Sequence, residues 1–185
     1  MLRLFIALHL PGQIKEELGK VLTDLRPLAE GIKWVEPENM HLTLKFLGDT
    51  EKDIVEGIAG AITHALTGRN AFKAKLTGCG GFPNIYNPRV IWAGLDESGF
   101  AVEMANSINK ELVKIGIEKD TKILSPHLTL GRIKKKSDLT PLTDYLRNLK
   151  FDSEAVIFDR AALIKSTLTP RGPIYEDLKK FKLEQ

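Results

Sequence analysis

The sequence predicts an α+β fold, and three observations lead to this prediction. Apolar residues recur at helical spacing in four segments, and apolar, strand-like segments lie between them. The resulting order is strand, helix, strands, helix, strands, helix, strand, helix, strands, a pattern typical of α+β proteins. The tetrapeptide His-Leu-Thr-Leu occurs twice, at 41–44 and 127–130, each time after a strand and a helix. This repeat indicates a duplicated unit, so we expect a single domain, 1–185, made of two closely packed lobes.

The first half of the chain is predicted to contain two amphipathic helices and three strands. Pro11 and Gly12 end the first strand, and Gly48 is expected to end the third. Thr50, with Asp53 three residues later, resembles a capping box for the second helix. In chain order the predicted segments are strand 2–8, helix 14–25, strand 33–35, strand 41–47 and helix 54–65.

The second half is predicted to contain two more helices and five strands. Gly116 lies where the C-cap of the third helix is expected, and Thr140 with Pro141 would make the N-cap and first position of the fourth. A loop at 78–88, whose glycines are interpreted as turn residues, joins two strands. A turn at 170–173 and a short polar tail close the chain. The predicted segments are strands 72–77 and 90–95, helix 99–115, strand 127–133, a helix capped at 140, and strands 155–160 and 161–167.

The composition is that of an ordinary soluble globular protein. Hydrophobic residues are 43% and charged residues 28% of the chain, and 185 residues suffice to bury a substantial core. The single cysteine, Cys79, excludes an internal disulfide and fits a reducing cytoplasm, where we expect the protein to be located. Residues 2–10 are interpreted as the first strand rather than a signal peptide, and no apolar stretch is long enough to span a membrane. The net charge of +3 permits an anionic partner without requiring one.

The repeated tetrapeptide carries the candidate chemistry. Successive side chains of a strand point to opposite faces, so His41 and Thr43 are expected on one face and Leu42 and Leu44 on the other. The second copy, at 127–130, repeats this arrangement. Amphipathic helices would cover the leucine faces, and the histidine and threonine faces would then oppose each other across a polar groove.

Two histidines and two threonines suit the hydrolysis of a phosphoester. Imidazole has an unperturbed pKa of about 6.5, so one ring can activate water while the other protonates the leaving oxygen. The hydroxyls of Thr43 and Thr129 can donate hydrogen bonds to phosphate oxygens, where charge develops in the transition state. The motifs lack the further ligands that a transition metal needs, so neither a metal nor a cofactor is expected. The alternative is a duplicated strand without catalysis.

Several short stretches outside the two tetrapeptides also match a known family of proteins. With them, the sequence resembles the 2H phosphoesterase superfamily, named for two His-x-Thr-x motifs. More narrowly, it resembles the RNA 2′,3′-cyclic phosphodiesterases, also called 2′-5′ RNA ligase-like proteins. The matching stretches are 3–7, 33–35, 44–48, 81–83, 88–92 and 125–132.

The resemblance implies a fold, a reaction and roles for four residues. The fold is a two-lobed, pseudo-twofold arrangement of antiparallel sheets with helices outside and a central cleft. The reaction is the metal-independent hydrolysis of a terminal RNA 2′,3′-cyclic phosphate to a 2′-phosphomonoester. His41 would be the general acid, His127 the general base, and Thr43 and Thr129 would hold the phosphate. The near symmetry of the cleft leaves the reverse assignment open.

Further residues are predicted to bind the phosphate or the base of the substrate. The resemblance marks Arg132 as a phosphate contact, although strict alternation places it on the leucine face unless Gly131 permits a bulge. Phe82, ahead of Tyr86, is a candidate for stacking on a base. Phe46 is expected to pack with the leucines.

Other residues have weaker expectations. Tyr175 resembles a family tyrosine near the cleft, His9 has no assigned role, and the lysines at 134–136 are expected in a solvated turn.

The expected partner is RNA with a 2′,3′-cyclic phosphate end, which includes tRNA fragments, and we expect a monomer. Two alternatives stay open. One is 2′-5′ ligation of RNA ends such as tRNA halves. The other is an RNA-binding module that recognises 3′ ends without turnover. The natural RNA and the preferred base are not predictable from the chain.

Overall fold

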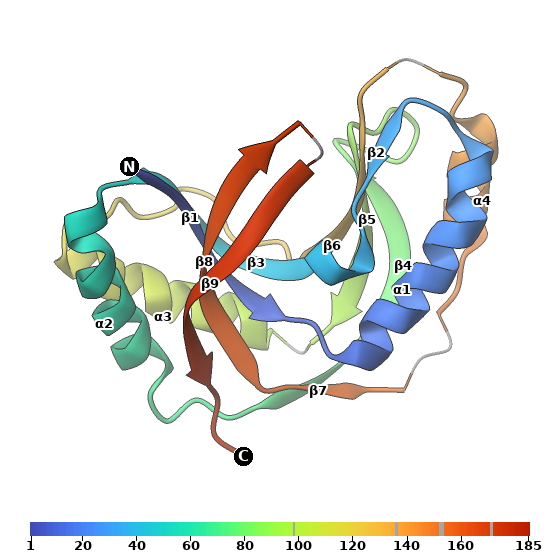
Figure 1. Ribbon diagram of the computed structural model, residues 1–185. Coiled ribbons are helices and arrows are strands. Elements are labelled where there is room, and N and C mark those ends of the chain that lie inside the picture. The colour runs from blue at the N-terminus through green and yellow to red at the C-terminus, as the bar shows by residue number, and fades with distance from the viewer. Residues whose placement is uncertain (98, 136, 152–153, 171) are drawn as a thin grey trace.

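The computed structural model describes residues 1–97, 99–135, 137–151, 154–170 and 172–185. Figure 1 shows how its helices and strands are arranged. In chain order they are β1 (Leu2–His9), α1 (Gly12–Leu25), β2 (Ile32–Trp34), β3 (His41–Thr50), α2 (Val55–Leu66), β4 (Phe72–Phe82), β5 (Val90–Asp96), α3 (Phe100–Lys114), β6 (His127–Ile133), α4 (Thr140–Asn148), β7 (Val156–Phe158), β8 (Arg160–Thr169) and β9 (Gly172–Lys182).

The strands form two sheets, which confirms the α+β prediction. One sheet has four strands in the order β3-β1-β8-β9, and the other has five in the order β2-β6-β5-β4-β7. Every pairing between these strands is antiparallel. In Figure 1, α2 and α3 lie on the side of the four-stranded sheet, and α1 and α4 lie beside the five-stranded sheet. Each of the two His-Leu-Thr-Leu strands therefore belongs to a different sheet.

The leucine faces of both motif strands are buried as predicted. Leu42 and Leu44 of β3 and Leu128 and Leu130 of β6 are at most 2% exposed. They pack with the apolar stripes of the helices in one continuous core. Burial of these leucines favours folding, since each apolar side chain fully removed from water stabilises the fold by about 1.5–3 kcal/mol. The opposite, polar face of each strand is thereby turned away from the core.

The strand β3 is longer than predicted, and the capping box is wrong. Gly48 does not end β3; it has a φ of +70° next to a register shift between β1 and β3, where a glycine permits a bulge. Thr50 is the last residue of the strand, and its hydroxyl donates to the carbonyl of Gly48 at 3.2 Å. A 3₁₀ turn, Lys52–Ile54, then leads into α2, which has no side-chain cap.

The glycines expected in a turn belong instead to β4, which runs on to Phe82. A Cβ atom at Gly80 would overlap the Trp92 indole on the neighbouring strand, and one at Gly81 would lie 2.6 Å from Pro88. Only glycine leaves room for these neighbouring side chains to pack directly on the strand. The need for glycine comes from residues outside the segment, so the sequence of the segment alone could not predict it.

The C-terminal segment also differs from the prediction. The residues expected to form a polar tail make the edge strand β9, which pairs with β8 along its whole length. Tyr175 and Asp177 of β9 are half-buried, so this edge strand adds both side chains to the four-stranded sheet. The predicted turn at 170–173 includes residue 171, and the predicted lysine turn includes residue 136; both lie outside the described residues.

The start of α4 and the length of the helices can also be compared with the predictions. Helix α4 begins one residue earlier than predicted, at Thr140 instead of Pro141, because Leu139 and not Thr140 is the N-cap. The Asp138 carboxylate accepts the N–H of Thr140 at 2.9 Å. Among the described residues, no helix is both long and apolar enough to cross a membrane.

Candidate active site

The two motif histidines are held by their backbone in the same way. His41 and His127 are the first residues of β3 and β6. Nδ1 of His41 lies 2.9 Å from the carbonyl oxygen of Asn39, and Nδ1 of His127 lies 2.7 Å from that of Ser125. A carbonyl only accepts hydrogen bonds, so Nδ1 carries the proton in both rings. Each Nε2 is therefore left to accept a proton when the ring is neutral and to donate one when it is charged.

The threonines follow the predicted alternation. Thr43 and Thr129 are half-buried like the histidines that precede them, whereas the leucines between them are fully buried. In the five-stranded sheet, Thr129 lies opposite Trp92. The histidine and threonine of each copy thus share the face that the core leaves uncovered.

A bulge then interrupts both motif strands at the same place. Between β1 and β3 the register skips Leu44, and between β5 and β6 it skips Leu130. Two consecutive residues of each strand are consequently buried, Leu44 with Lys45 and Leu130 with Gly131. The next residues, Phe46 and Arg132, therefore return to the face of the histidines, where both are exposed.

These bulges confirm one prediction and overturn another. Arg132 lies on the His127 face, as the predicted bulge near Gly131 requires. Phe46 does not pack with the leucines: its side chain is 68% exposed, and its ring centroid lies 6.1 Å from that of Phe5. Phe5 in turn lies 4.6 Å from the ring of His41. The prediction for Phe46 was wrong because strict alternation takes no account of the bulge.

His41 sits among aromatic rings and positive charges. The ring of Tyr175 meets it edge-on at 5.2 Å, beside Phe5. Burial lowers the pKa of His41 to about 4, and the charges of His9, Arg132 and Lys15 act in the same direction. The imidazole is therefore neutral near pH 7 when no anion is bound.

Arg132 connects the two sheets electrostatically. Burial raises the pKa of the Tyr175 hydroxyl, and the positive charge of Arg132 opposes that rise. The same guanidinium acts on His41. Arg132 belongs to β6, whereas His41 and Tyr175 belong to β3 and β9 of the other sheet, so the polar faces of the two sheets meet around this arginine.

His127 has aromatic neighbours of its own. The ring of Phe82, the last residue of β4, meets His127 edge-on with centroids 5.0 Å apart. Phe82 also contacts Trp92 at 5.4 Å. Each histidine is thus contacted by an aromatic side chain of its own sheet. Phe5 comes from β1, next to the strand of His41, and Phe82 comes from β4, which is separated from the strand of His127 by β5.

Comparison with known proteins matches this chain over nearly its whole length. A family model described as LigT-like phosphoesterase matches residues 8–92 and 98–175. The RNA 2′,3′-cyclic phosphodiesterase of Archaeoglobus fulgidus is 37% identical over 182 residues, which are 98% of this chain and 100% of that protein. The protein of the same name from Methanocaldococcus jannaschii is 37% identical, covering 97% of this chain and 100% of the relative.

The chain belongs to the LigT-like phosphoesterase family. Among solved structures of similar fold, TT0787 of Thermus thermophilus has a TM-score of 0.86 and 30% identity, covering 98% of this chain and 97% of that one. The crystal structure of E. coli LigT with 3′-AMP has a TM-score of 0.80 at 22% identity, covering 100% and 99%. At that identity the E. coli structure supports the fold alone.

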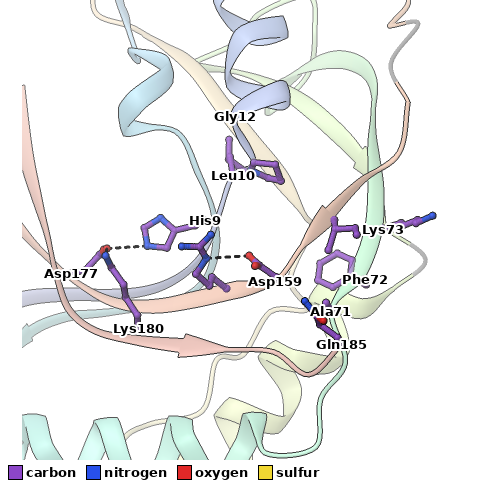
Figure 2. Close-up of a pocket in the computed structure, with 13 residues that line it drawn as sticks. His9, Leu10, Gly12, Ala71, Phe72, Lys73, Asp159, Asp177, Lys180 and Gln185 are labelled. Atoms are coloured by element: carbon purple, nitrogen blue, oxygen red, sulfur yellow. Dashed lines mark hydrogen bonds and ion pairs between the residues drawn. The ribbon is translucent and has the colours of Figure 1, made fainter.

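One feature of this LigT-like phosphoesterase had no signal in the sequence. His9, at the end of β1, lies opposite His41 in the strand pairing, and its Nε2 lies 3.1 Å from Oδ2 of Asp177. Figure 2 shows this pair at the wall of a cavity of about 940 Å³, where Lys180 also reaches Asp177. Because β1 and β9 are not paired with each other and lie far apart in the chain, no local pattern could have predicted this pair.

Two further residues are the candidate Tyr86 and the single cysteine, Cys79. Tyr86 is 74% exposed and packs under the guanidinium of Arg147 on α4, with 5.5 Å to the ring centroid. Burial raises the pKa of the Cys79 thiol to about 12, so this cysteine is not a nucleophile at neutral pH. Within the described ranges, no group of three or more histidine, cysteine or carboxylate side chains could hold a metal ion.

Proposed function

We propose that this protein hydrolyses the 2′,3′-cyclic phosphate at the end of an RNA to a 2′-phosphomonoester, with the two motif histidines as acid and base. The observation that carries the proposal is the matching hydrogen bond of His41 and His127, which leaves Nε2 of each ring available for proton transfer. The names of the relatives from Archaeoglobus and Methanocaldococcus, RNA 2′,3′-cyclic phosphodiesterase, support the substrate class. The 3′-AMP bound in E. coli LigT fits a nucleotide in such a site.

In the proposed reaction, His127 removes a proton from water while the water oxygen bonds to phosphorus. The bond from phosphorus to the ribose 3′-oxygen breaks, and His41 gives that oxygen a proton. The product keeps its phosphate on the 2′-oxygen, and the two rings have exchanged protonation states. Each positioned proton transfer accelerates such a reaction by about 10²–10⁴-fold. The scheme uses neither a metal ion nor a cofactor.

The remaining polar groups would stabilise the developing charge. Arg132 would hold non-bridging phosphate oxygens, and the hydroxyls of Thr43 and Thr129 would donate to them. Burial, with the neighbouring positive charges as smaller causes, keeps His41 neutral. A bound phosphate anion acts against these causes, so substrate binding would itself favour protonation of the acid.

Aromatic side chains would bind the terminal base. Phe46 offers an exposed ring on the His41 side, and Phe82 offers a more enclosed ring against His127. We propose that Phe46 stacks on the base, since bases bind exposed aromatic faces. Phe82 would contact the nucleotide while holding the His127 ring in place.

The test uses an oligoribonucleotide with a 2′,3′-cyclic phosphate end, incubated with enzyme in the presence of EDTA. The expected product is a 2′-phosphomonoester, and His41→Ala and His127→Ala should each lose nearly all of the rate. His64→Ala is the matched control, because His64 is exposed on α2 and pairs only with Glu111 among the described residues. Circular dichroism shows whether each variant is folded.

Three other outcomes would favour a different function or mechanism. With a 5′-hydroxyl RNA added, a 2′-5′ junction would show that ligation accompanies hydrolysis. Tight binding of the RNA without any product would instead favour a module that recognises RNA ends. Full activity of folded His41→Ala would contradict the two-histidine mechanism.

A further inference from the structure

Lys33 lies beside Arg132 on the face that carries His127. Strand β2 pairs with β6, and Lys33 stands opposite Arg132 in that pairing. Residues directly opposite each other in an antiparallel pair project to the same face, with Cβ atoms about 4.5–5.5 Å apart. Ile32 and Trp34, on either side of Lys33, pack against the core, whereas Lys33 is exposed. A second positive charge therefore stands next to Arg132, on the edge strand of the five-stranded sheet.

The other sheet approaches Lys33 from across the site. A Cβ atom on Gly172, the first residue of β9, would lie 3.9 Å from Nζ of Lys33. Further along β9, the charge of Arg132 reaches Tyr175. Figure 1 shows the end of the β8–β9 hairpin close to β2. Lys33 thus stands at the rim where the hairpin meets β2, and Arg132 stands further inside, near His41.

Neither charge is neutralised by the part of the chain that the structure describes. The ion pairs and side-chain hydrogen bonds there involve other cations, such as Arg26 with Glu36 and Lys165 with Glu176. Two like charges directly opposite each other in a sheet repel and destabilise the pair. Anions bound beside the two charges offset this repulsion, and RNA carries its anions in a row along the backbone.

We infer that Lys33 binds the phosphodiester on the 5′ side of the terminal nucleotide. This inference rests on the proposed function, in which Arg132 holds the cyclic phosphate itself. The strand then leaves the site between β2 and the end of the β8–β9 hairpin. Lys33 makes the enzyme prefer an RNA end, which has that phosphodiester, over a nucleoside 2′,3′-cyclic phosphate, which lacks it.

The experiment compares three substrates with wild-type enzyme, Lys33→Met and Lys20→Met. The substrates are a nucleoside 2′,3′-cyclic phosphate, a dinucleotide ending in the same group, and that dinucleotide with an uncharged methylphosphonate linkage. Lys20, an exposed lysine of α1, is the matched control. Lys33→Met should raise KM for the charged dinucleotide on the order of fivefold, as expected for one exposed charge pair. Its kcat, and both constants for the mononucleotide, should equal those of Lys20→Met.

The methylphosphonate separates contact with this phosphate from a general effect of charge. The uncharged linkage should raise KM for the wild type and leave KM of Lys33→Met unchanged, since the two changes remove one interaction. Salt should also weaken dinucleotide binding less steeply in Lys33→Met, by about 0.7 in the logarithmic slope. Equal penalties from methylphosphonate in both enzymes, or an equal effect of Lys33→Met on mononucleotide and dinucleotide, would overturn the inference. A wild type that opens none of the cyclic phosphates would instead overturn the proposed function.

Discussion

His9 lies directly opposite His41 where β1 pairs with β3, and an ion pair with Asp177 at 3.1 Å holds its ring. The two imidazoles share one face of the four-stranded sheet, and positive charge on His9 disfavours positive charge on His41. Lys15 of α1 and Arg132 of β6 act on His41 in the same direction, whereas the carbonyl of Asn39 favours the charged ring. Burial is thus the largest influence that keeps the proposed acid neutral, and charged side chains from three other elements add to it.

Replacing His9 with Gln should raise the pKa of His41 above its value of about 4. The substitution removes the positive charge of His9 but keeps the negative charge of Asp177. The net charge near His41 becomes more negative, which favours the charged form of His41. An NMR titration of the His41 ring measures this directly. His64→Gln is the control, and a His41 titration identical in wild type and His9→Gln would contradict the prediction.

Phosphate binding at about pH 5.5 should be accompanied by proton uptake at His41. The free ring is mostly neutral there because burial lowers its pKa to about 4, and a bound anion raises that pKa, so the bound state holds more protons. Calorimetry in two buffers with different ionisation heats gives the number of protons taken up. His41→Gln should take up fewer protons than the wild type, and equal uptake by both would show that the proton goes elsewhere.

Replacing Phe46 with Ala should lower kcat/KM for the cyclic phosphate roughly tenfold, since stacking of one base on an aromatic ring is worth about 1–3 kcal/mol. Phe46 is 68% exposed, so the fold should lose little stability. Steady-state kinetics with thermal unfolding separates the two effects. Val113→Ala, at an exposed apolar position of α3, should change neither quantity. Unchanged kinetics in Phe46→Ala would leave Phe82 as the stacking residue.

Gly80→Ala should destabilise the protein on the order of 1–3 kcal/mol, the usual result of overpacking. The added methyl would overlap the Trp92 indole and push it toward Thr129, which lies opposite Trp92. Gly78→Ala on the same strand is a matched control, because a Cβ atom there meets nothing within 4 Å. Urea unfolding compares the stability of the two variants. Equal midpoints would show that the Trp92 side chain moves aside without any loss of stability.

The local pattern of the chain was sufficient to predict much of the fold. The four helices follow from apolar residues at helical spacing, because a helix that buries one face needs that spacing whatever its partners are. The strand 127–133 agrees with β6 residue for residue. The burial of Leu42 and Leu128, with His41 and His127 on the opposite face, follows from the period of a strand. These features depend only on residues that are close together in the sequence.

The placement of Phe46, Lys33 and His9 required the tertiary structure. Phe46 changes faces because pairing with β1 leaves Leu44 unpaired, and a register shift is a property of two strands together. Lys33 stands beside Arg132 through the pairing of β2 with β6, and His9 meets Asp177 across the four-stranded sheet. Periodicity describes how one segment buries its own face. It carries no information about which distant segment will lie opposite, and that choice brings the charges of this site together.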